Sequence, residues 1–377
     1  MAKKFMFPPH LNKIEQNYRQ LLWRDAMHFI LASSILGLLY SLLTDSFDSF
    51  IPFINGLIIG FVCGVGVAWS ELVLFRNATR KMNFITLVAL KVFTTVVIVT
   101  ITIFTVILFS RSLTAGKHPV EMLSSEAFAH FLREEDFPYM ILYAFGMACL
   151  ILFTKQMSRK MGRGILFNFI SGKYAKPFHE DRIFLFVDLD ASSALAENIG
   201  DLSYHSLLND FFCDLAEPVL ASKGAIHHYV GDEVVITWKM VEGITSGNCL
   251  KGYFGIVEKM DKLREKYKSR FGFIPTFKAA LHCGSIVVGE VGDIKSEIVF
   301  HGDVINTTSR IERLCSDLNE KLLISGDVLE KLPAYNDLFT FAGNFLLRGK
   351  KESTALYRLR KDDAAVVVHQ DEACLNA

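Results

Sequence analysis

The chain has 377 residues, of which 51% are hydrophobic and 21% are charged, and its mean hydropathy is +0.30. This composition is too apolar for a disordered chain, and the length exceeds that of one small domain, so we expect two or three modules. Forty Lys and Arg residues balance forty Asp and Glu residues, which removes the basic excess that binding to nucleic acid requires.

The long apolar stretches lie before residue 156. Four of them approach or exceed the roughly 20 residues that a helix needs to cross about 30 Å of hydrocarbon. They run over Met27–Thr44, Ile51–Phe75, Asn83–Phe109 and Phe137–Lys155. Buried helices of a soluble protein rarely give four such runs in succession. The pattern therefore predicts four transmembrane helices and a lipid bilayer as a partner.

The basic residues predict the orientation of these spans. They gather in the N-terminal arm, in the loop that holds Arg76 and Arg80, and in the segment after the fourth span. Loops rich in Lys and Arg remain on the cytoplasmic side, so both ends of the chain are expected there. We predict a multi-pass protein of the plasma (inner) membrane whose C-terminal half is cytoplasmic.

Two features stand out within the spans. Gly56, Gly60 and Gly64 recur every four residues and leave a flat stripe for close helix packing, either within the chain or against a second copy. Glu71 and Lys91 fall at matching depths near the inner ends of their spans. Because a charge in lipid is costly unless it is paired, we expect an ion pair, with a sensing role as the alternative.

Residues 156–178 predict a helix that leaves the membrane. The stretch begins with basic residues and continues with apolar ones near helical spacing, from Ile165 to Tyr174, until Pro177 stops it. The predicted organisation has five parts. They are a cytosolic arm (1–26), a transmembrane domain (27–155), a connecting helix (156–179), a soluble domain (180–360) and a flexible tail (361–377).

Two acidic residues follow strand patterns in the soluble half. Asp188 ends an apolar, β-rich run, and Asp232 lies at the tip of a hairpin that the alternating residues of 225–238 predict. If the hairpin lies beside the first strand, the two carboxylates converge. Such a pair suits Mg²⁺ or Mn²⁺ bound together with substrate phosphates. Taken alone, each acid is more often a solvated turn residue.

A later helix carries a second polar pair. Two predicted strands, Phe277–Val291 and Glu297–His301, are followed by a helix that begins at Asp303. Asn306 and Arg310 lie four residues apart on it and so share a face. An amide and a guanidinium on one face can hold a sugar oxygen and the charge that develops on a phosphorane. The alternative is a surface pair on an amphipathic helix.

These motifs together resemble the catalytic domain of class III nucleotidyl cyclases, the adenylate and guanylate cyclase family, over about residues 182–359. The matching pieces keep the order and spacing of the family. They are Phe186-Val187-Asp188-Leu189, Val230-Gly231-Asp232-Glu233, His282-Cys283-Gly284 and Gly302–Arg310. The resemblance implies an α+β, ferredoxin-like domain with helices on one face of its sheet, placed after the α-helical four-span membrane domain. It also implies a head-to-tail homodimer with active sites between the subunits.

The resemblance implies a role for each site residue. Asp188 and Asp232 would hold two divalent ions per site, Mg²⁺ or Mn²⁺, with the Leu189 carbonyl as an extra ligand. From the other subunit, Asn306 would orient the ribose and Arg310 would stabilise the reacting α-phosphate. One metal would help to deprotonate the ribose 3′-hydroxyl and the other would neutralise the pyrophosphate.

The residues expected to select the base depart from the family pattern. Members that select adenine often have Lys four residues before the second metal Asp, where this chain has His228. They often have Asp or Thr seven residues before the ribose Asn, where Val299 stands. His228 could meet the purine edge, or it could be structural. Arg348 falls where the family often has a basic phosphate contact.

We therefore predict a membrane-bound adenylate cyclase that converts ATP into cyclic AMP and pyrophosphate in signal transduction. ATP is preferred over GTP because adenylate cyclases are the commoner members of such architectures. The alternatives are a guanylate cyclase and an inactive membrane scaffold that uses the domain for dimerisation. A diguanylate cyclase is disfavoured, since the segment Val230–Val234 lacks the paired glycines and the Phe of that family's signature loop.

Overall fold

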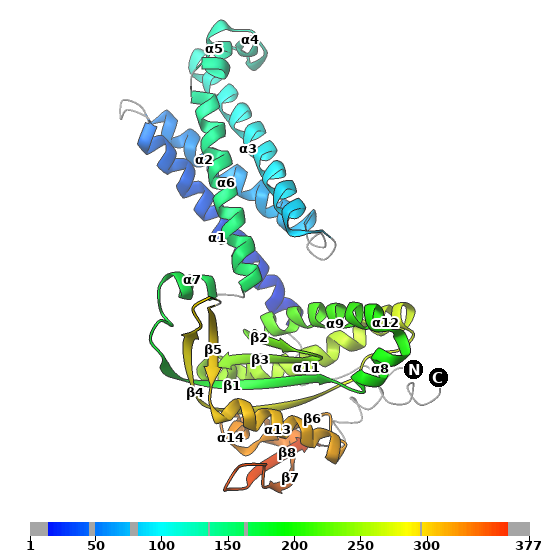
Figure 1. Ribbon diagram of the computed structural model, residues 1–377. Helices are drawn as coiled ribbons and strands as arrows, with labels where there is room; N and C mark the ends of the chain where they lie inside the picture. The colour runs from blue at the N-terminus through cyan, green and yellow to red at the C-terminus, as the bar shows by residue number, and fades with distance from the viewer. Residues whose placement is uncertain are drawn as a thin grey trace. The chain divides into compact units, whose positions relative to one another are not determined.

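The computed structural model describes residues 14–44, 50–75, 82–134, 136–161, 165–294 and 296–360. It has two compact units, one formed by Arg19–Met161 and one by the remaining described residues (Figure 1). The predicted tail, the first half of the predicted arm and the loop of Arg76 and Arg80 lie outside the described residues.

The first unit is a bundle of helices. It contains α1 (Ile14–Thr44), α2 (Ile51–Val73), α3 (Phe84–Ala115), α4 (Pro119–Leu123), α5 (Glu126–Glu134) and α6 (Asp136–Met161). Four of its helices are long and apolar enough to cross a membrane, which confirms the four predicted apolar helices. The observed helices α1 and α6 are longer than predicted, because hydropathy marks only the apolar part of a helix and polar residues with good helix propensity extend it.

The glycine stripe of α2 packs against α1 of the same chain. A Cβ atom added at Gly56 would lie 2.5 Å from the carbonyl oxygen of Gly37, and one at Gly60 would lie 2.7 Å from Cα of Ser34. Real side chains cannot approach a backbone so closely, so only glycine permits this helix spacing. The stripe is therefore an intramolecular packing surface.

An ion cluster joins three helices of the first unit. Nζ of Lys91 lies 2.8 and 2.9 Å from the two carboxylate oxygens of Glu71, as the matching depths predicted. Lys155 of α6 adds a second cation, with its Nζ 3.6 Å from Glu71. The Lys91 side chain is only 6% exposed, so this pairing offsets the cost of its burial.

The second unit is built on one mixed sheet. Its strands are β1 (Phe178–Leu189), β2 (Ala225–Val230), β3 (Glu233–Lys239), β4 (Phe277–Val291), β5 (Glu297–His301), β6 (Leu322–Ser325), β7 (Phe339–Phe345) and β8 (Thr354–Leu359). The strand order is β2-β3-β1-β4-β6-β8-β7, with β5 paired to β4. Only β4 and β6 pair in parallel. The strands β2-β3-β1-β4, linked by two helical crossovers, have the ferredoxin-like order, which confirms the predicted fold class.

Helices connect and cover this sheet. They are α7 (Ile165–Ile170), α8 (Ser192–Ile199), α9 (Asp201–Ala221), α10 (Met240–Ile244), α11 (Asn248–Lys262), α12 (Arg264–Phe271), α13 (Asp303–Leu318) and α14 (Gly326–Leu329), with 3₁₀ turns η2 (Thr245–Gly247) and η3 (Pro333–Leu338).

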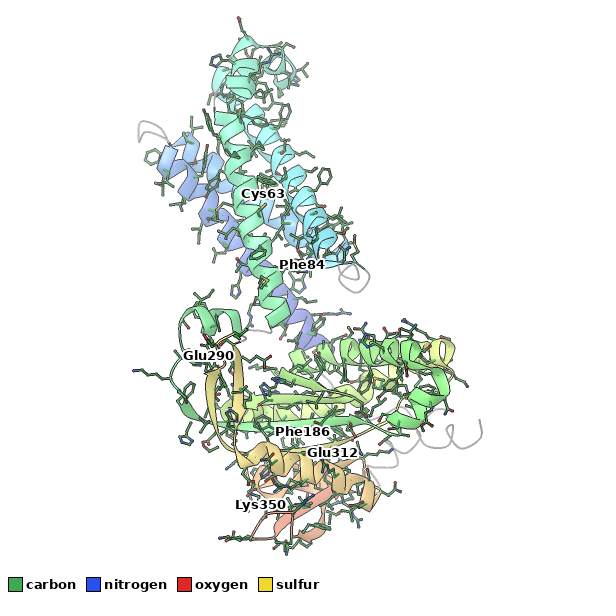
Figure 2. The ribbon with its side chains drawn as sticks, in the orientation of Figure 1. Cys63, Phe84, Phe186, Glu290, Glu312 and Lys350 are labelled. Atoms are coloured by element: carbon green, nitrogen blue, oxygen red, sulfur yellow. The ribbon has the colours of Figure 1, made fainter. Side chains whose placement is uncertain are left out.

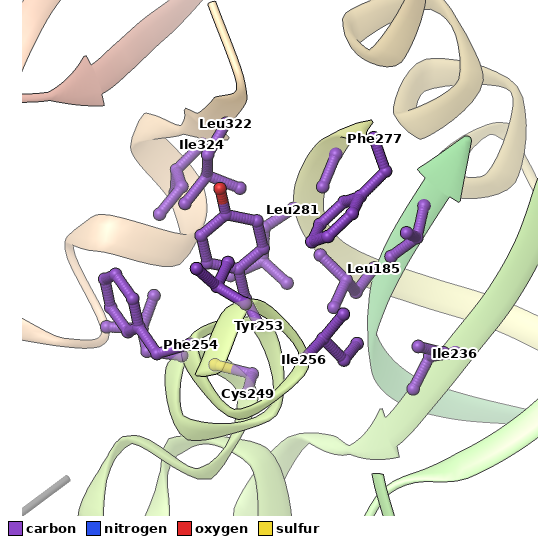
Figure 3. Close-up of a cluster of buried hydrophobic side chains, with 14 of the residues drawn as sticks. Leu185, Ile236, Cys249, Tyr253, Phe254, Ile256, Phe277, Leu281, Leu322 and Ile324 are labelled. Carbon is purple, nitrogen blue, oxygen red and sulfur yellow. The ribbon is translucent and has the colours of Figure 1, made fainter. Parts of the chain in front are cut away.

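The alternation of β1 separates two cores. Leu185 and the odd-numbered residues beside it pack against α9 and α11, and Figure 3 shows Leu185 and Leu281 close to Tyr253 and Ile256 of α11. The even-numbered Phe186 belongs to a smaller core on the other face, with Val304 of α13. The expectation of helices on one face thus holds for α9 and α11, whereas α13 covers part of the opposite face.

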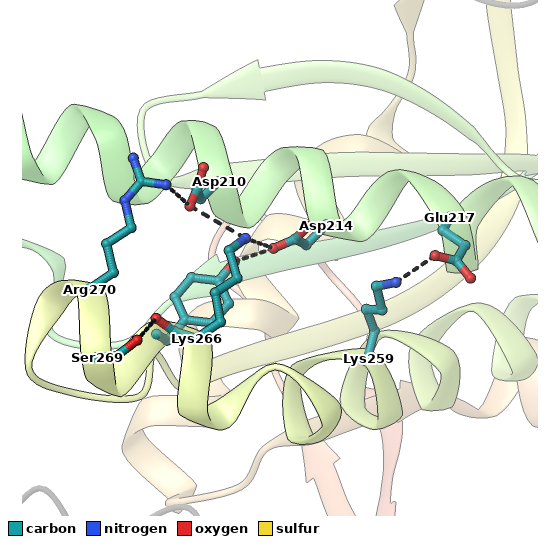
Figure 4. A network of polar contacts seen from close by, with 8 residues as sticks. Asp210, Asp214, Glu217, Lys259, Lys266, Ser269 and Arg270 are labelled. Carbon is teal, nitrogen blue, oxygen red and sulfur yellow. Dashed lines mark hydrogen bonds and ion pairs between the residues drawn. The ribbon is translucent and has the colours of Figure 1, made fainter. Parts of the chain in front are cut away.

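Ion pairs fix α9 against its neighbours (Figure 4). Asp210 accepts a 2.6 Å hydrogen bond from Arg270, and Asp214 accepts one of 2.6 Å from Lys266, both on α12. Asp214 is buried and also accepts a hydrogen bond from the hydroxyl of Tyr267. These contacts hold α9 and α12 together.

The connecting helix is shorter than predicted. α6 ends at Met161, residues 162–164 are outside the described residues, and α7 ends at Ile170 rather than near Pro177. The cause is Gly172, whose φ of +65° is left-handed, with the Lys173 N–H bonded to the carbonyl of Asn168 at 3.0 Å. Such a glycine stops a helix.

Candidate active site

Two carboxylates meet where β1 approaches the hairpin. Asp188 lies near the end of β1, on the face away from α9 and α11, and Leu189 is the last residue of that strand. Asp232 follows Gly231 in the turn between β2 and β3, where Gly231 has the left-handed φ of +64° that such turns favour. The register pairs Asp188 with Glu233, which brings the turn beside the strand end.

The electrostatics of Asp188 reflect this convergence. Burial raises the pKa of Asp188, and the nearby charge of Asp232 raises it further. The structure thus brings together the two acids that the strand patterns marked. A carboxylate pair of this kind repels itself unless a cation lies between its members.

A lysine that the sequence motifs did not mark contacts one member of this pair, Asp188. Nζ of Lys278, on β4, lies 3.3 Å from Oδ2 of Asp188 and 3.3 Å from Oε1 of Glu312 on α13. Although burial lowers it, the carboxylates of Glu312 and Asp188 raise the pKa of Lys278 above its ordinary value. The contact of Lys278 with Asp188 follows from the strand register, which places these two residues opposite each other. This register cannot be read from the sequence. Figure 2 shows Glu312 on α13.

The site carries more negative than positive charge. Burial, together with Glu312, Asp188 and Asp232, raises the pKa of Glu233 to about 7. Among the described residues, no three His, Cys, Asp or Glu side chains are grouped so as to hold a metal by themselves. A divalent ion at Asp188 and Asp232 would therefore complete its shell with a backbone carbonyl, phosphate oxygens and water, a donor set that fits Mg²⁺ and Mn²⁺.

Asn306 and Arg310 belong to a second group of side chains. Asn306 is exposed on α13, and Nη1 of Arg310 is buried without a hydrogen-bond partner among the described residues. Arg310 helps to lower the pKa of Asp303, after the stronger effect of Lys350, which forms an ion pair with Asp303. The main charges acting on Asp188 are instead those of Asp232, Lys278 and Asp190.

The geometry of α13 accounts for this separation. Glu312 lies two residues after Arg310 and so points about 200° away around the helix axis. It forms an ion pair with Lys278, which also contacts Asp188 of the same chain. Asn306 and Arg310, which share a face, are directed elsewhere. One chain therefore carries the carboxylate pair and the amide–guanidinium pair as two separate groups of side chains.

The loop before β8 packs against Arg310. A Cβ atom at Gly349, whose φ is +78°, would lie 3.6 Å from Nη2 of Arg310. Arg348, the predicted phosphate contact, is exposed beside it. The neighbouring Lys350 is the residue that holds the start of α13 through Asp303.

The two histidines of β2 differ in their surroundings. His228 is exposed and follows a bulge in the pairing with β3. His227 is the more buried, and its ring stacks on Phe300 with 4.1 Å between centroids. Burial, His228 and Arg182 lower the pKa of His227 to about 3. The predicted role of His228 at the purine remains a prediction. Val299, on β5, pairs with Gly289 of β4.

Comparisons with known proteins agree with this architecture. Residues 175–361 match the family described as the adenylate and guanylate cyclase catalytic domain. Adenylate cyclase 2 of Rhizobium meliloti (strain 1021) is 38% identical over 193 residues, which cover 51% of this chain and 53% of that protein. The adenylate cyclase of Anabaena cylindrica is 25% identical over 47% of this chain and 36% of its own length.

A solved structure has the same fold. A bacterial light-regulated adenylyl cyclase superposes with a TM-score of 0.50 and 18% identity, over 61% of this chain and 66% of that chain. The chain spans about half the length of the Rhizobium relative.

Proposed function

Because residues 175–361 belong to the adenylate and guanylate cyclase catalytic domain family, we propose that this chain is a membrane-bound adenylate cyclase. It converts ATP into 3′,5′-cyclic AMP and pyrophosphate for intracellular signalling, with the catalytic unit on the cytoplasmic side. The observation that carries the proposal is the convergence of Asp188 and Asp232 in a region with excess negative charge. The named relatives are adenylate cyclases, which favours ATP over GTP.

The carboxylate half-site would bind the metal and the triphosphate. Asp188, Asp232 and the carbonyl of Leu189 would hold two Mg²⁺ or Mn²⁺ ions. When bound, such ions lower the pKa of the attacking ribose 3′-hydroxyl and neutralise the leaving pyrophosphate. Lys278 would balance the remaining charge of Asp188 and keep its carboxylate oriented, as the 3.3 Å contact supports.

The other half-site would come from a second copy of the chain. Asn306 of the partner subunit would orient the ribose, and Arg310 of the partner subunit would stabilise charge on the α-phosphate. The unpartnered Nη1 of Arg310 supports this role, because an anion would satisfy a buried donor that the described residues leave without a hydrogen bond. Arg348 would contact phosphate, and His228 would contact the purine.

The reaction needs no covalent intermediate on the protein. The ribose 3′-hydroxyl gives its proton to water, and its oxygen attacks the α-phosphorus in line with the departing pyrophosphate. The bond from the 3′-oxygen to the α-phosphorus forms as the bond from the α-phosphorus to the bridging oxygen of the pyrophosphate breaks. The side chains position these atoms and stabilise charge. Because one half-site binds the metal ions and the other positions the ribose and the α-phosphate, residues from both must meet for turnover.

A mixing experiment tests the proposal. The full chain in nanodiscs is supplied with ATP or GTP and with Mg²⁺ or Mn²⁺, and the products are separated by chromatography. Asp188→Ala and Arg310→Ala should each lower turnover at least about 100-fold. Mixed and reassembled, the two variants should regain about a quarter of wild-type activity, since half of random dimers are mixed and each has one intact site of two.

Asp181→Ala is the matched control, because Asp181 is an exposed acid on the same strand. It should retain wild-type turnover. No turnover of either nucleotide with either metal would instead identify an inactive scaffold. Cyclic GMP as the main product would make the chain a guanylate cyclase, and no recovery on mixing would contradict the shared site.

A further inference from the structure

The membrane unit contains a cavity that nucleotide chemistry does not use. Its volume is about 460 Å³, and residues of α1, α2, α3, α5 and α6 line it. This volume lies in the range of small-molecule sites, which are commonly formed between helices of a bundle. Figure 2 marks Cys63 of α2, one of the lining residues.

Ser33 and Thr95 lie further along the cavity, but most of the polar lining residues gather at one end of it. They come from the end of α1, the start of α2, the end of α3 and the start of α6, which all lie at the same end of the bundle. They are Tyr40, Asn55, Ser110, Arg111, Thr114 and Tyr143. Further along the helices the lining is mainly aliphatic, with Ile59, Ile103, Ile107 and Met147 among its residues. The cavity is thus mainly apolar along its length and more polar at one end. We call the apolar part the shaft and the polar end the mouth.

The depth of the mouth can be estimated along α3. Lys91, in the ion cluster with Glu71, precedes Arg111 by twenty residues, which is about 30 Å of helix rise. That length equals the hydrocarbon thickness of a bilayer. Arg111 therefore lies at the membrane boundary opposite the ion cluster, and the distribution of basic loops assigns that boundary to the outside.

The polar groups at the mouth are held in defined positions. The guanidinium of Arg111 lies 4.4 Å from the ring centroid of Phe131, a side chain that is 1% exposed. Nδ2 of Asn55 donates a 2.9 Å hydrogen bond to Oγ of Ser110, which ties α2 to α3. A cation fixed in this way can meet a ligand with little further ordering.

We propose that this cavity binds a single-chain amphiphile with an anionic head group, such as a long-chain carboxylate. The head group contacts Arg111 at the mouth and the alkyl chain fills the shaft. A guanidinium donates two parallel hydrogen bonds to a carboxylate, which selects an anionic head over a neutral one. The aliphatic lining packs against the alkyl chain through van der Waals contacts, which are what favour apolar association inside a bilayer.

Photolabelling of the full chain in nanodiscs tests where the ligand binds. The probe is dodecanoate with a diazirine in the middle of its chain, and the labelled peptides are mapped by mass spectrometry. We expect label on shaft residues of α3 and α6, such as Ile107 and Met147, with competition by unlabelled dodecanoate. Label spread over lipid-facing residues such as Phe93 and Leu142, without competition, would overturn the proposal.

Two variants test the head and the shaft separately. Arg111→Gln should weaken dodecanoate binding at least tenfold while dodecanol, with its neutral head, binds as before. Ala148→Phe should abolish both, since Ala148 is 7% exposed and lines the shaft. Arg133→Gln is the matched control, because Arg133 is exposed on α5 and outside the cavity lining.

The remaining outcomes also decide the question. Equal loss of dodecanoate and dodecanol in Arg111→Gln would show that the head group is not recognised and would refute the anionic class. If Arg111→Gln does not assemble, the wild-type chain decides the head group: dodecanoate should bind at least tenfold more tightly than dodecanol, and equal affinities would refute the anionic class. Lipid extraction from the purified chain shows whether the occupant of the cavity is a single-chain amphiphile or a bilayer phospholipid. A two-chain bilayer phospholipid as the only occupant, undisplaced by dodecanoate, would overturn the proposal.

Discussion

Lys278 links β1 to α13 within a single chain, because it contacts both Asp188 on β1 and Glu312 on α13. Lys278→Met should destabilise the metal-free protein by about 1–2 kcal/mol, since it leaves two partly buried carboxylates without their cation. Bound Mn²⁺ would replace that cation, so the loss of folding stability caused by Lys278→Met should be smaller at saturating Mn²⁺. Thermal unfolding with and without Mn²⁺ measures both values.

The same substitution should lower the dissociation constant for Mn²⁺ severalfold, because the lysine competes with the metal for Asp188. Calorimetric titration measures this effect without any turnover. Lys278→Arg is the conservative control and should keep wild-type behaviour in both experiments. Equal destabilisation with and without Mn²⁺ would show that Lys278 serves packing alone.

His227 should make stability depend on pH. Its folded pKa of about 3 lies below the ordinary 6.5, so from pH 6.5 downward the unfolded chain takes up a proton that the folded chain excludes. Stability should therefore fall by about 1 kcal/mol per pH unit between pH 6.5 and 3. His227→Phe retains the stacking on Phe300 and removes this contribution.

Urea denaturation at pH 7.5 and pH 5.0 measures the difference. His205→Phe, at an exposed position of α9, is the control for a changed surface. An unchanged pH dependence in His227→Phe would contradict the assignment. The sequence marks both histidines of β2 equally, because only the position of Phe300 distinguishes the buried ring from the exposed one.

Individual elements were predictable where their signal is local. The apolar run of β1, the turn at Gly231 and the start of α13 at Asp303 all carry such signals, and the structure contains these elements. The end of the connecting helix was not predicted correctly, because the apolar spacing continues past Gly172. The contact of Lys278 depends on strand register, which no local pattern encodes.

The close packing of α1 against α2 predicts that a large side chain at Gly60 destabilises the membrane unit. Gly60→Leu should destabilise the membrane unit by about 2 kcal/mol or more, because its side chain would collide with the backbone of α1 at Ser34. Gly146→Leu is the matched control, since a Cβ atom at Gly146 meets nothing within 4 Å. Thermal unfolding in one detergent compares the two variants. Equal unfolding midpoints would contradict the packing of the glycine stripe against α1.

For the whole molecule, hydropathy predicted the division into an apolar helical part and an α+β part, because the two have different compositions. The participation of Lys155 in the ion cluster was not predictable, since it requires the relative placement of three helices. The separation of Arg310 from Asp188 within one chain likewise appears only once α13 is placed on the sheet.

That separation predicts how the second unit behaves alone. It has its own core, so residues 165–377 should fold without the membrane helices. If each complete site draws on two chains, as proposed, the unit's specific activity should rise with protein concentration. Assays from nanomolar to micromolar protein check this, and a constant specific activity accompanied by monomers in sedimentation would contradict it.

α13 presents Glu312 on one side and Arg310 on the other. In a homodimer, a small rotation of this helix about its axis would disturb the carboxylates of one active site and withdraw the guanidinium from the other. The two centres would then start and stop as a pair, so an input that rotates α13 would act on the output of the entire assembly at once.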